Sequence, residues 1–152
     1  MSQSPAINQL IVNILLADDD IDDCNFFKKA LESISVPTQL KIVADGEKLM
    51  EYLDGPEQLP HVLFLDINMP RKNGFECLAE IKRNAKLKSL PVVMISTANS
   101  TDKMQMLFKT GANIYVRKAN TLEDLVQIIR NALPIALDSP FSETNLKYIF
   151  NA

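Results

Sequence analysis

One stretch of the chain decides the fold: Ile11-Val12-Asn13-Ile14-Leu15-Leu16-Ala17-Asp18-Asp19-Asp20. A short apolar run that ends in acids is typical of a buried strand that stops at a polar rim. The pattern recurs three times, where apolar runs end at Asp66, at Ser96-Thr97 and at Arg117-Lys118. The segments between these runs carry apolar residues at three- and four-residue spacing, which predicts helices.

Five strand patterns alternate with five helix patterns over residues 10–133. Strands that are apolar along most of their length are expected when helices cover both faces of a parallel sheet, and right-handed crossovers then fix the topology. The sequence therefore predicts a single α/β domain with a doubly wound, five-stranded parallel sheet. The pattern breaks at Pro134. We expect residues 134–152 to form a short tail, either a helix docked on the domain or a segment that orders on binding.

Composition narrows the class of protein. The 152 residues carry a formal net charge of -3 and are 47% hydrophobic, which favours one soluble globular domain. No overall positive charge attracts nucleic acid or an anionic membrane. No apolar run approaches the ~20 residues of a membrane-spanning helix, and the first residues lack the pattern of a secretory signal. We expect a cytoplasmic protein that binds neither nucleic acid nor membrane.

The strand ends predict a site. Because the carboxyl ends of parallel strands lie along one edge of a sheet, ligands bind there. Asp18, Asp19 and Asp66 would form a carboxylate cluster that needs a cation, since close like charges raise one another's pKa. Hard oxygen ligands select a hard ion such as Mg²⁺. With Lys118 as a positive charge and Ser96 as a hydroxyl donor, the set suits phosphoryl transfer to Asp66. Asp20 is interpreted as the N-terminal cap of the first helix.

In order along the chain, these residues resemble the receiver domain of bacterial two-component response regulators. Residues 15–19 resemble the acidic pair after its first strand, and residues 65–74 resemble its phosphorylation loop. Ser96 takes the position of its switch hydroxyl residue, Lys118 that of its lysine, and Tyr115 that of the aromatic residue that changes rotamer on activation. The resemblance covers about residues 10–133.

The resemblance implies a phosphoacceptor and a magnesium site. Asp66 would take the phosphoryl group from a phosphohistidine of a sensor histidine kinase. Asp19, Asp66 and the backbone carbonyl of Asn68 would bind Mg²⁺ directly, and Asp18 would act through water. The protein would then be a signalling phosphoacceptor with self-catalysed phosphoryl transfer and hydrolysis, rather than an enzyme in the usual sense.

The resemblance also implies a switch. Ser96, with Thr97 beside it, and Lys118 would bond phosphoryl oxygens, and Tyr115 would turn inward as Ser96 moves. The surface around the fourth helix and fifth strand would then change. We expect this surface, which includes Lys103, Phe108 and Tyr115, to bind a downstream protein or phosphotransfer partner, or to form a phosphorylation-linked dimer of an otherwise monomeric chain. The loop of residues 70–74 is reminiscent of small regulators that partner phytochrome-type kinases.

One departure from the family pattern leaves alternatives open. The family normally follows its lysine with a proline in a cis bond, and here Ala119 stands in that place. Because a cis bond before another residue costs ~3 kcal/mol, we predict a trans Lys118–Ala119 bond. Ala119 favours a second interpretation, a receiver-like docking module that is not phosphorylated. A third is a haloacid dehalogenase-like phosphatase, since Asp18-Asp19-Asp20 fits its DxD motif, with Asp18 as the nucleophile.

Overall fold

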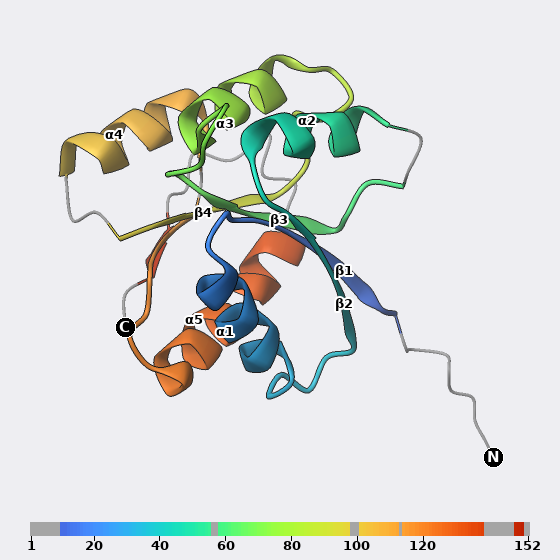
Figure 1. The fold of residues 1–152 in the computed structure, drawn as a ribbon, viewed down its shortest axis with the longest axis vertical. Coiled ribbons are helices and arrows are strands. Elements are labelled where there is room, and N and C mark those ends of the chain that lie inside the picture. Colours follow the sequence, from blue (N-terminus) through green and yellow to red (C-terminus); the bar gives the residue numbers. More distant parts are fainter. Residues whose placement is uncertain (1–9, 56–57, 98–100, 113, 139–147, 151–152) are drawn as a thin grey trace.

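The computed structural model describes residues 10–55, 58–97, 101–112, 114–138 and 148–150. They form one parallel sheet in the order β2-β1-β3-β4-β5-β6, with helices on both of its faces (Figure 1). The strands are β1 (Val12–Ala17), β2 (Thr38–Val43), β3 (Val62–Asp66), β4 (Val92–Ser96), β5 (Ile114–Arg117) and β6 (Tyr148–Phe150). The helices are α1 (Ile21–Leu31), α2 (Gly46–Asp54), α3 (Gly74–Arg83), α4 (Thr101–Thr110) and α5 (Leu122–Leu137). The predicted doubly wound sheet is confirmed for β1 to β5.

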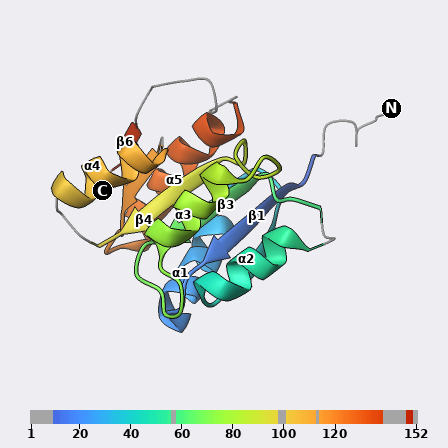
Figure 2. The same cartoon turned by 90° about the horizontal axis from the view of Figure 1, so that it is seen from above.

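The core has two layers, one on each face of the sheet. Along β1, Ile14 and Leu16 pack in the layer that α1 and α5 cover, whereas Leu15 and Ala17 pack in the layer beneath α2, α3 and α4. This alternation follows from the two-residue period of a strand. Figure 2 shows α2, α3 and α4 lying side by side over one face, with α1 and α5 behind the sheet.

Polar caps begin the helices close to the ends of the strands. Asp20 accepts a hydrogen bond from the amide of Asp23 and caps α1, as predicted. Asp45 caps α2, Asn73 forms a reciprocal capping box with Glu76 at the start of α3, and Thr121 caps α5. Each cap satisfies an amide that the first helical turn leaves unpaired.

The tail combines the end of a helix with a short strand. Helix α5 continues through Pro134 to Leu137. The buried side chains of Leu133 and Ala136 offset the backbone hydrogen bond that the proline removes. Residues 148–150 then form β6, a strand that pairs in parallel with β5, so β5 is not the edge of the sheet. The helical alternative for the tail therefore agrees with residues 134–137 and is wrong over 148–150, whereas residues 139–147 and 151–152 lie outside the described part of the chain.

Within the part of the chain that the structure describes, no helix has the length and apolarity required to cross a bilayer.

Candidate functional site

The predicted site residues meet at the carboxyl edge of the sheet. Asp66 is the last residue of β3, and Ser96 is the last residue of β4. Asp18 directly follows β1, and Lys118 directly follows β5. The strand register brings these ends level, because Asp66 pairs with Ile95 and Ser96 pairs with the residue before Lys118. The topology alone therefore gathers the acids, the hydroxyl and the ammonium.

The acids form a compact cluster. Ligand oxygens of Asp18, Asp19 and Asp66 lie within 4.8 Å of one another. Asp19 is exposed, whereas Asp18 and Asp66 are only 4% and 3% exposed. Burial raises the pKa of Asp66 to about 6. The positive charge of Lys118 lowers this pKa only in part, and the negative charge of Asp18 raises it further. Burial also raises the pKa of Asp18, against the hydrogen bond that its carboxylate accepts from the Asp20 amide.

The donor set fits a divalent cation. A buried carboxylate pair whose pKa values are raised lacks sufficient positive charge, and a bound cation supplies it. Carboxylate oxygens are the ligands of hard ions such as Mg²⁺ and Mn²⁺. Asn68, the further predicted ligand, lies in the loop beside the cluster, and its amide donates a long 3.4 Å hydrogen bond to the carboxylate of Asp66.

Lys118 reaches across the sheet edge into the cluster. Its Nζ lies 3.6 Å from Oδ2 of both Asp18 and Asp66, but only 2.6 Å from Oδ2 of Asp23. Burial by itself disfavours the charged ammonium, but the hydrogen bond to Asp23 and the charges of Asp66 and Asp18 outweigh it. The pKa of Lys118 is therefore raised. Asp23 is the contact that the sequence did not single out. The Lys118–Ala119 bond is trans, as predicted.

The predicted switch residues are distributed between the core and the surface. Ser96 is fully buried, and its carbonyl accepts a 3.0 Å hydrogen bond from the amide of Lys118. Thr97, the next residue, is exposed. Tyr115 is fully buried in the layer beneath α4. The expectation that Tyr115 contributes to an exposed partner surface is wrong for this conformation, because its ring is already inside. Phe108 packs half-buried against the same layer.

The loop after Asp66 is held between α2 and α3. Arg71 adopts a left-handed backbone conformation (φ 67°), which residues other than glycine rarely adopt. Its guanidinium Nε lies 3.5 Å from the buried carboxylate of Asp45. A Cβ atom at Gly46 would overlap the carbonyl oxygen of Lys72. The loop therefore has close neighbours on α2 that constrain its path away from Asp66.

With this geometry in place, comparison with known families decides the class. Residues 14–130 match the response regulator receiver domain. The chain belongs to this family. A receiver is a signalling phosphoacceptor rather than a conventional enzyme, so membership decides against the phosphatase interpretation. The acid cluster is accordingly a divalent-cation site of the receiver type.

Relatives of the receiver include regulators linked to light sensing. The chain is 33% identical over 124 residues to response regulator Rcp1 of Synechocystis sp., a match that covers 77% of this chain and 83% of the relative. It is similar to the solved phosphorylated cyanobacterial phytochrome response regulator RcpA, with a TM-score of 0.78 and 33% identity over 85% of this chain and 96% of that one. The Mn²⁺-bound form of Rcp1 gives a TM-score of 0.75 and 31% identity over 84% and 96% of the two chains.

Proposed function

We propose that Asp66 accepts a phosphoryl group from a phosphohistidine of a sensor histidine kinase, with Mg²⁺ in the acid cluster. One observation carries the proposal. The buried carboxylate of Asp66 ends β3 within 4.8 Å of two further acids, and it lies 3.6 Å from the ammonium of Lys118. A nucleophilic carboxylate between a cation site and a fixed positive charge is the arrangement that phosphoryl transfer needs.

In the proposed reaction a carboxylate oxygen of Asp66 attacks the phosphorus atom. An oxygen–phosphorus bond forms, the bond from phosphorus to the histidine nitrogen of the kinase breaks, and that nitrogen takes a proton from solvent. Lys118 and the hydroxyl of Ser96, with Thr97 beside it, bond the phosphoryl oxygens. Mg²⁺ in the acid cluster would supply positive charge there when bound. By the family resemblance, Asp18, Asp19, Asp66 and the Asn68 carbonyl are the groups that would hold the ion.

The partners follow from the same proposal. In this proposal residues 10–133 act as the receiver, residues 134–152 are its tail, and the chain signals by contact with other proteins. The likeness to phytochrome response regulators supports a phytochrome-type kinase as the phosphoryl donor. In its phosphorylated form the chain would bind a downstream protein or phosphotransfer partner. It would act in the cytoplasm as a monomer or as a phosphorylation-linked dimer.

Phosphodonor labelling tests this function. The protein is incubated with acetyl phosphate and Mg²⁺, and intact-mass measurement should find one added phosphoryl group that hydroxylamine removes. Asp66→Asn should abolish the addition, whereas the matched control Asp20→Asn, at the exposed helix cap, should retain it. Label that persists in Asp66→Asn and maps to Asp18 would revive the phosphatase interpretation. A folded wild-type protein that takes no label from either acetyl phosphate or a phosphorylated kinase would be a docking module.

A further inference from the structure

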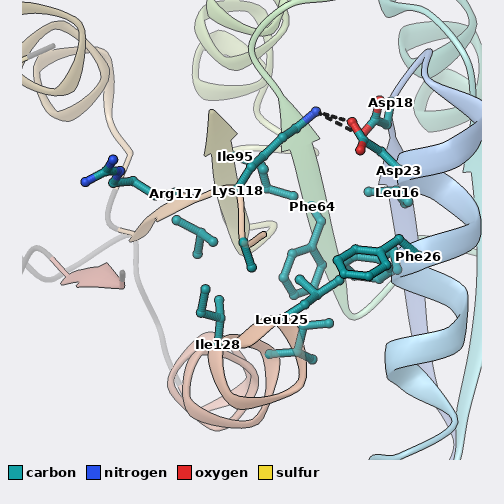
Figure 3. A pocket seen from close by; sticks show the side chains of 14 residues that line it. Leu16, Asp18, Asp23, Phe26, Phe64, Ile95, Arg117, Lys118, Leu125 and Ile128 are labelled. Carbon is teal, nitrogen blue, oxygen red and sulfur yellow. Dashed lines mark hydrogen bonds and ion pairs between the residues drawn. The ribbon is translucent and has the colours of Figure 1, made fainter. Parts of the chain in front are cut away.

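Lys118 makes its shortest polar contact outside the acid cluster. Its ammonium lies 2.6 Å from Asp23, one ångström closer than to Asp18 or Asp66. The Asp23 side chain is 39% exposed, whereas those of Asp18 and Asp66 are 4% and 5% exposed. Figure 3 shows the Lys118 side chain extending from the end of β5 toward Asp18 and Asp23, while Arg117 points the other way. The ammonium of Lys118 therefore lies between the buried acids and the more exposed Asp23, and is closer to Asp23.

The position of Asp23 on α1 explains why this contact is available. Asp23 lies in the first turn of the helix, where its own amide donates to the cap residue Asp20. Because Asp20 is the cap, the carboxylate of Asp23 has no capping role. It lies toward the sheet edge and accepts a hydrogen bond from Lys118. A charge-assisted hydrogen bond of this length is among the stronger polar contacts in a protein.

The stem of Lys118 also has space beside it. A cavity of about 50 Å³ lies between α1, α5 and the sheet, and the side chains of Asp23 and Lys118 line its polar end. The remainder of its lining is largely apolar and includes Leu16, Phe26, Phe64, Ile95, Leu125 and Ile128 (Figure 3). The short side chain of Ala119 is part of this lining. The Lys118 stem is therefore bordered by a small, largely apolar space on the side of α5.

We propose that Asp23 is a positioning residue that competes with the phosphoryl group on Asp66 for the ammonium of Lys118. This inference rests on the proposed function of Asp66. A phosphoryl group brings close to two negative charges and new acceptor oxygens, which draw the ammonium inward. Asp23 holds it outward in the unphosphorylated state. Because a ligand shifts an equilibrium only through differential contacts, the Asp23 contact opposes phosphorylation and favours the resting state.

Beryllofluoride, which mimics the phosphoryl group on an aspartate, is the probe. Its affinity in the presence of Mg²⁺ is measured by ¹⁹F NMR for the wild type, Asp23→Asn and Asp22→Asn. Asp22 is the matched control, since it lies in the same first turn, is exposed and gives the same change in charge. Removing the competing negative charge should tighten binding by roughly three- to tenfold in Asp23→Asn, with less than a twofold change in Asp22→Asn. Unchanged or weaker binding by Asp23→Asn, or an equal gain in Asp22→Asn, would overturn the competition.

A spectroscopic readout separates positioning from a general structural effect. The ε-methylene signal of Lys118 is assigned by its loss in Lys118→Met. In Asp23→Asn without beryllofluoride this signal should already move toward the position that it takes in the wild type with beryllofluoride, while Asp22→Asn should leave it in place. A signal unmoved by Asp23→Asn would contradict the proposal. A failed proposed function looks different, because the wild type would then bind beryllofluoride no better than Asp66→Asn.

Discussion

Gly74 lies against the backbone of Asp66, so closely that a Cβ atom at position 74 would stand 2.5 Å from the Asp66 carbonyl oxygen. The amide of Gly74 also donates a 2.8 Å hydrogen bond to the carbonyl of Ile67. The first residue of α3 therefore fixes the backbone that carries Asp66, the proposed phosphoacceptor. Glycine is required here for close approach rather than for an unusual dihedral angle.

Gly74→Ala should consequently damage both stability and phosphorylation. Overpacking a tight site costs about 1–3 kcal/mol, and the displacement falls on Asp66 itself. We expect a lower urea midpoint together with slower labelling by acetyl phosphate. Gly55→Ala is the control, because an added Cβ there meets only carbonyl oxygens of its own helix at 3.3 Å or more. A Gly74→Ala variant with wild-type midpoint and labelling rate would show that the loop relaxes without cost.

The raised pKa of Asp66 predicts how the stability of the metal-free protein depends on pH. Its value is about 6 in the folded state against an ordinary 3.8. Between these values the unfolded carboxyl is ionised while the folded one still holds its proton, so the folded state binds more protons. The free energy of unfolding therefore falls as pH rises from about 4 to 6 and stays lower above that range.

Asp66→Asn should remove this pH-dependent fall in the free energy of unfolding. Relative to the wild type in EDTA, the variant should gain on the order of 2 kcal/mol in stability between pH 4 and pH 7. Urea denaturation at the two pH values measures it. Mg²⁺ should restore the wild type at pH 7, since it binds the folded carboxylates. Asp54→Asn, at an exposed carboxyl that ends α2, should leave the difference between the two pH values unchanged. Asp66→Asn could instead show the same stability difference between pH 4 and pH 7 as the wild type. In that case neighbouring groups already compensate the charge of the buried Asp66 carboxylate without metal.

Much of the site could be predicted because topology, not fine packing, assembles it. Asp18, Asp66, Ser96 and Lys118 each end an apolar run, and the carboxyl ends of parallel strands must lie along one edge. Helix caps such as Asp20 were also predictable, since capping depends on local backbone geometry. The doubly wound parallel sheet and the acid cluster therefore followed from patterns that are short in sequence.

Other features of the structure depend on how helices and strands are oriented against one another, which the pattern of apolar and polar residues does not specify. Asp22 and Asp23 are adjacent acids in one helical turn, and only the rotation of α1 against the sheet decides which of them reaches Lys118. The strand pattern places Tyr115 within β5, but its inward packing depends on how α4 covers this strand. The pairing of β6 with β5 is a long-range contact across a segment without strand periodicity, and it contradicts the helical alternative for residues 148–150.

Mg²⁺ binding should depend on Asp19 and not on its neighbour Asp20. Only Asp19 belongs to the acid cluster, whereas Asp20 caps α1. Asp19→Ala should weaken Mg²⁺ binding by an order of magnitude or more. Asp20→Ala should lower stability by about 1 kcal/mol through loss of the cap and leave the affinity unchanged. Titrating the thermal midpoint with Mg²⁺ distinguishes the two effects. Equal losses of affinity would place Asp20 among the groups that hold the ion.

The last prediction concerns output. The carbonyl of Ser96 is bonded to the amide of Lys118, so the ends of β4 and β5 are joined beside the phosphoacceptor. A phosphoryl group that draws the Ser96 hydroxyl and the Lys118 ammonium inward should therefore move both strand ends, and with them α4. Tyr115 already occupies the inward position, so activation should reduce excursions from this packing rather than create it.

Amide hydrogen exchange with and without beryllofluoride tests this model. Exchange should slow severalfold in α4 and β5, while α2, on the far side of α3, should serve as the unchanged reference. Ser96→Ala should abolish the slowing in α4 and still bind beryllofluoride, because Lys118 and the acid cluster remain. Ser96→Thr, which keeps the hydroxyl, should retain the slowed exchange in α4. Protection confined to residues 67–73 in the wild type would exclude the switch and leave a receiver that only drains phosphoryl groups from its kinase.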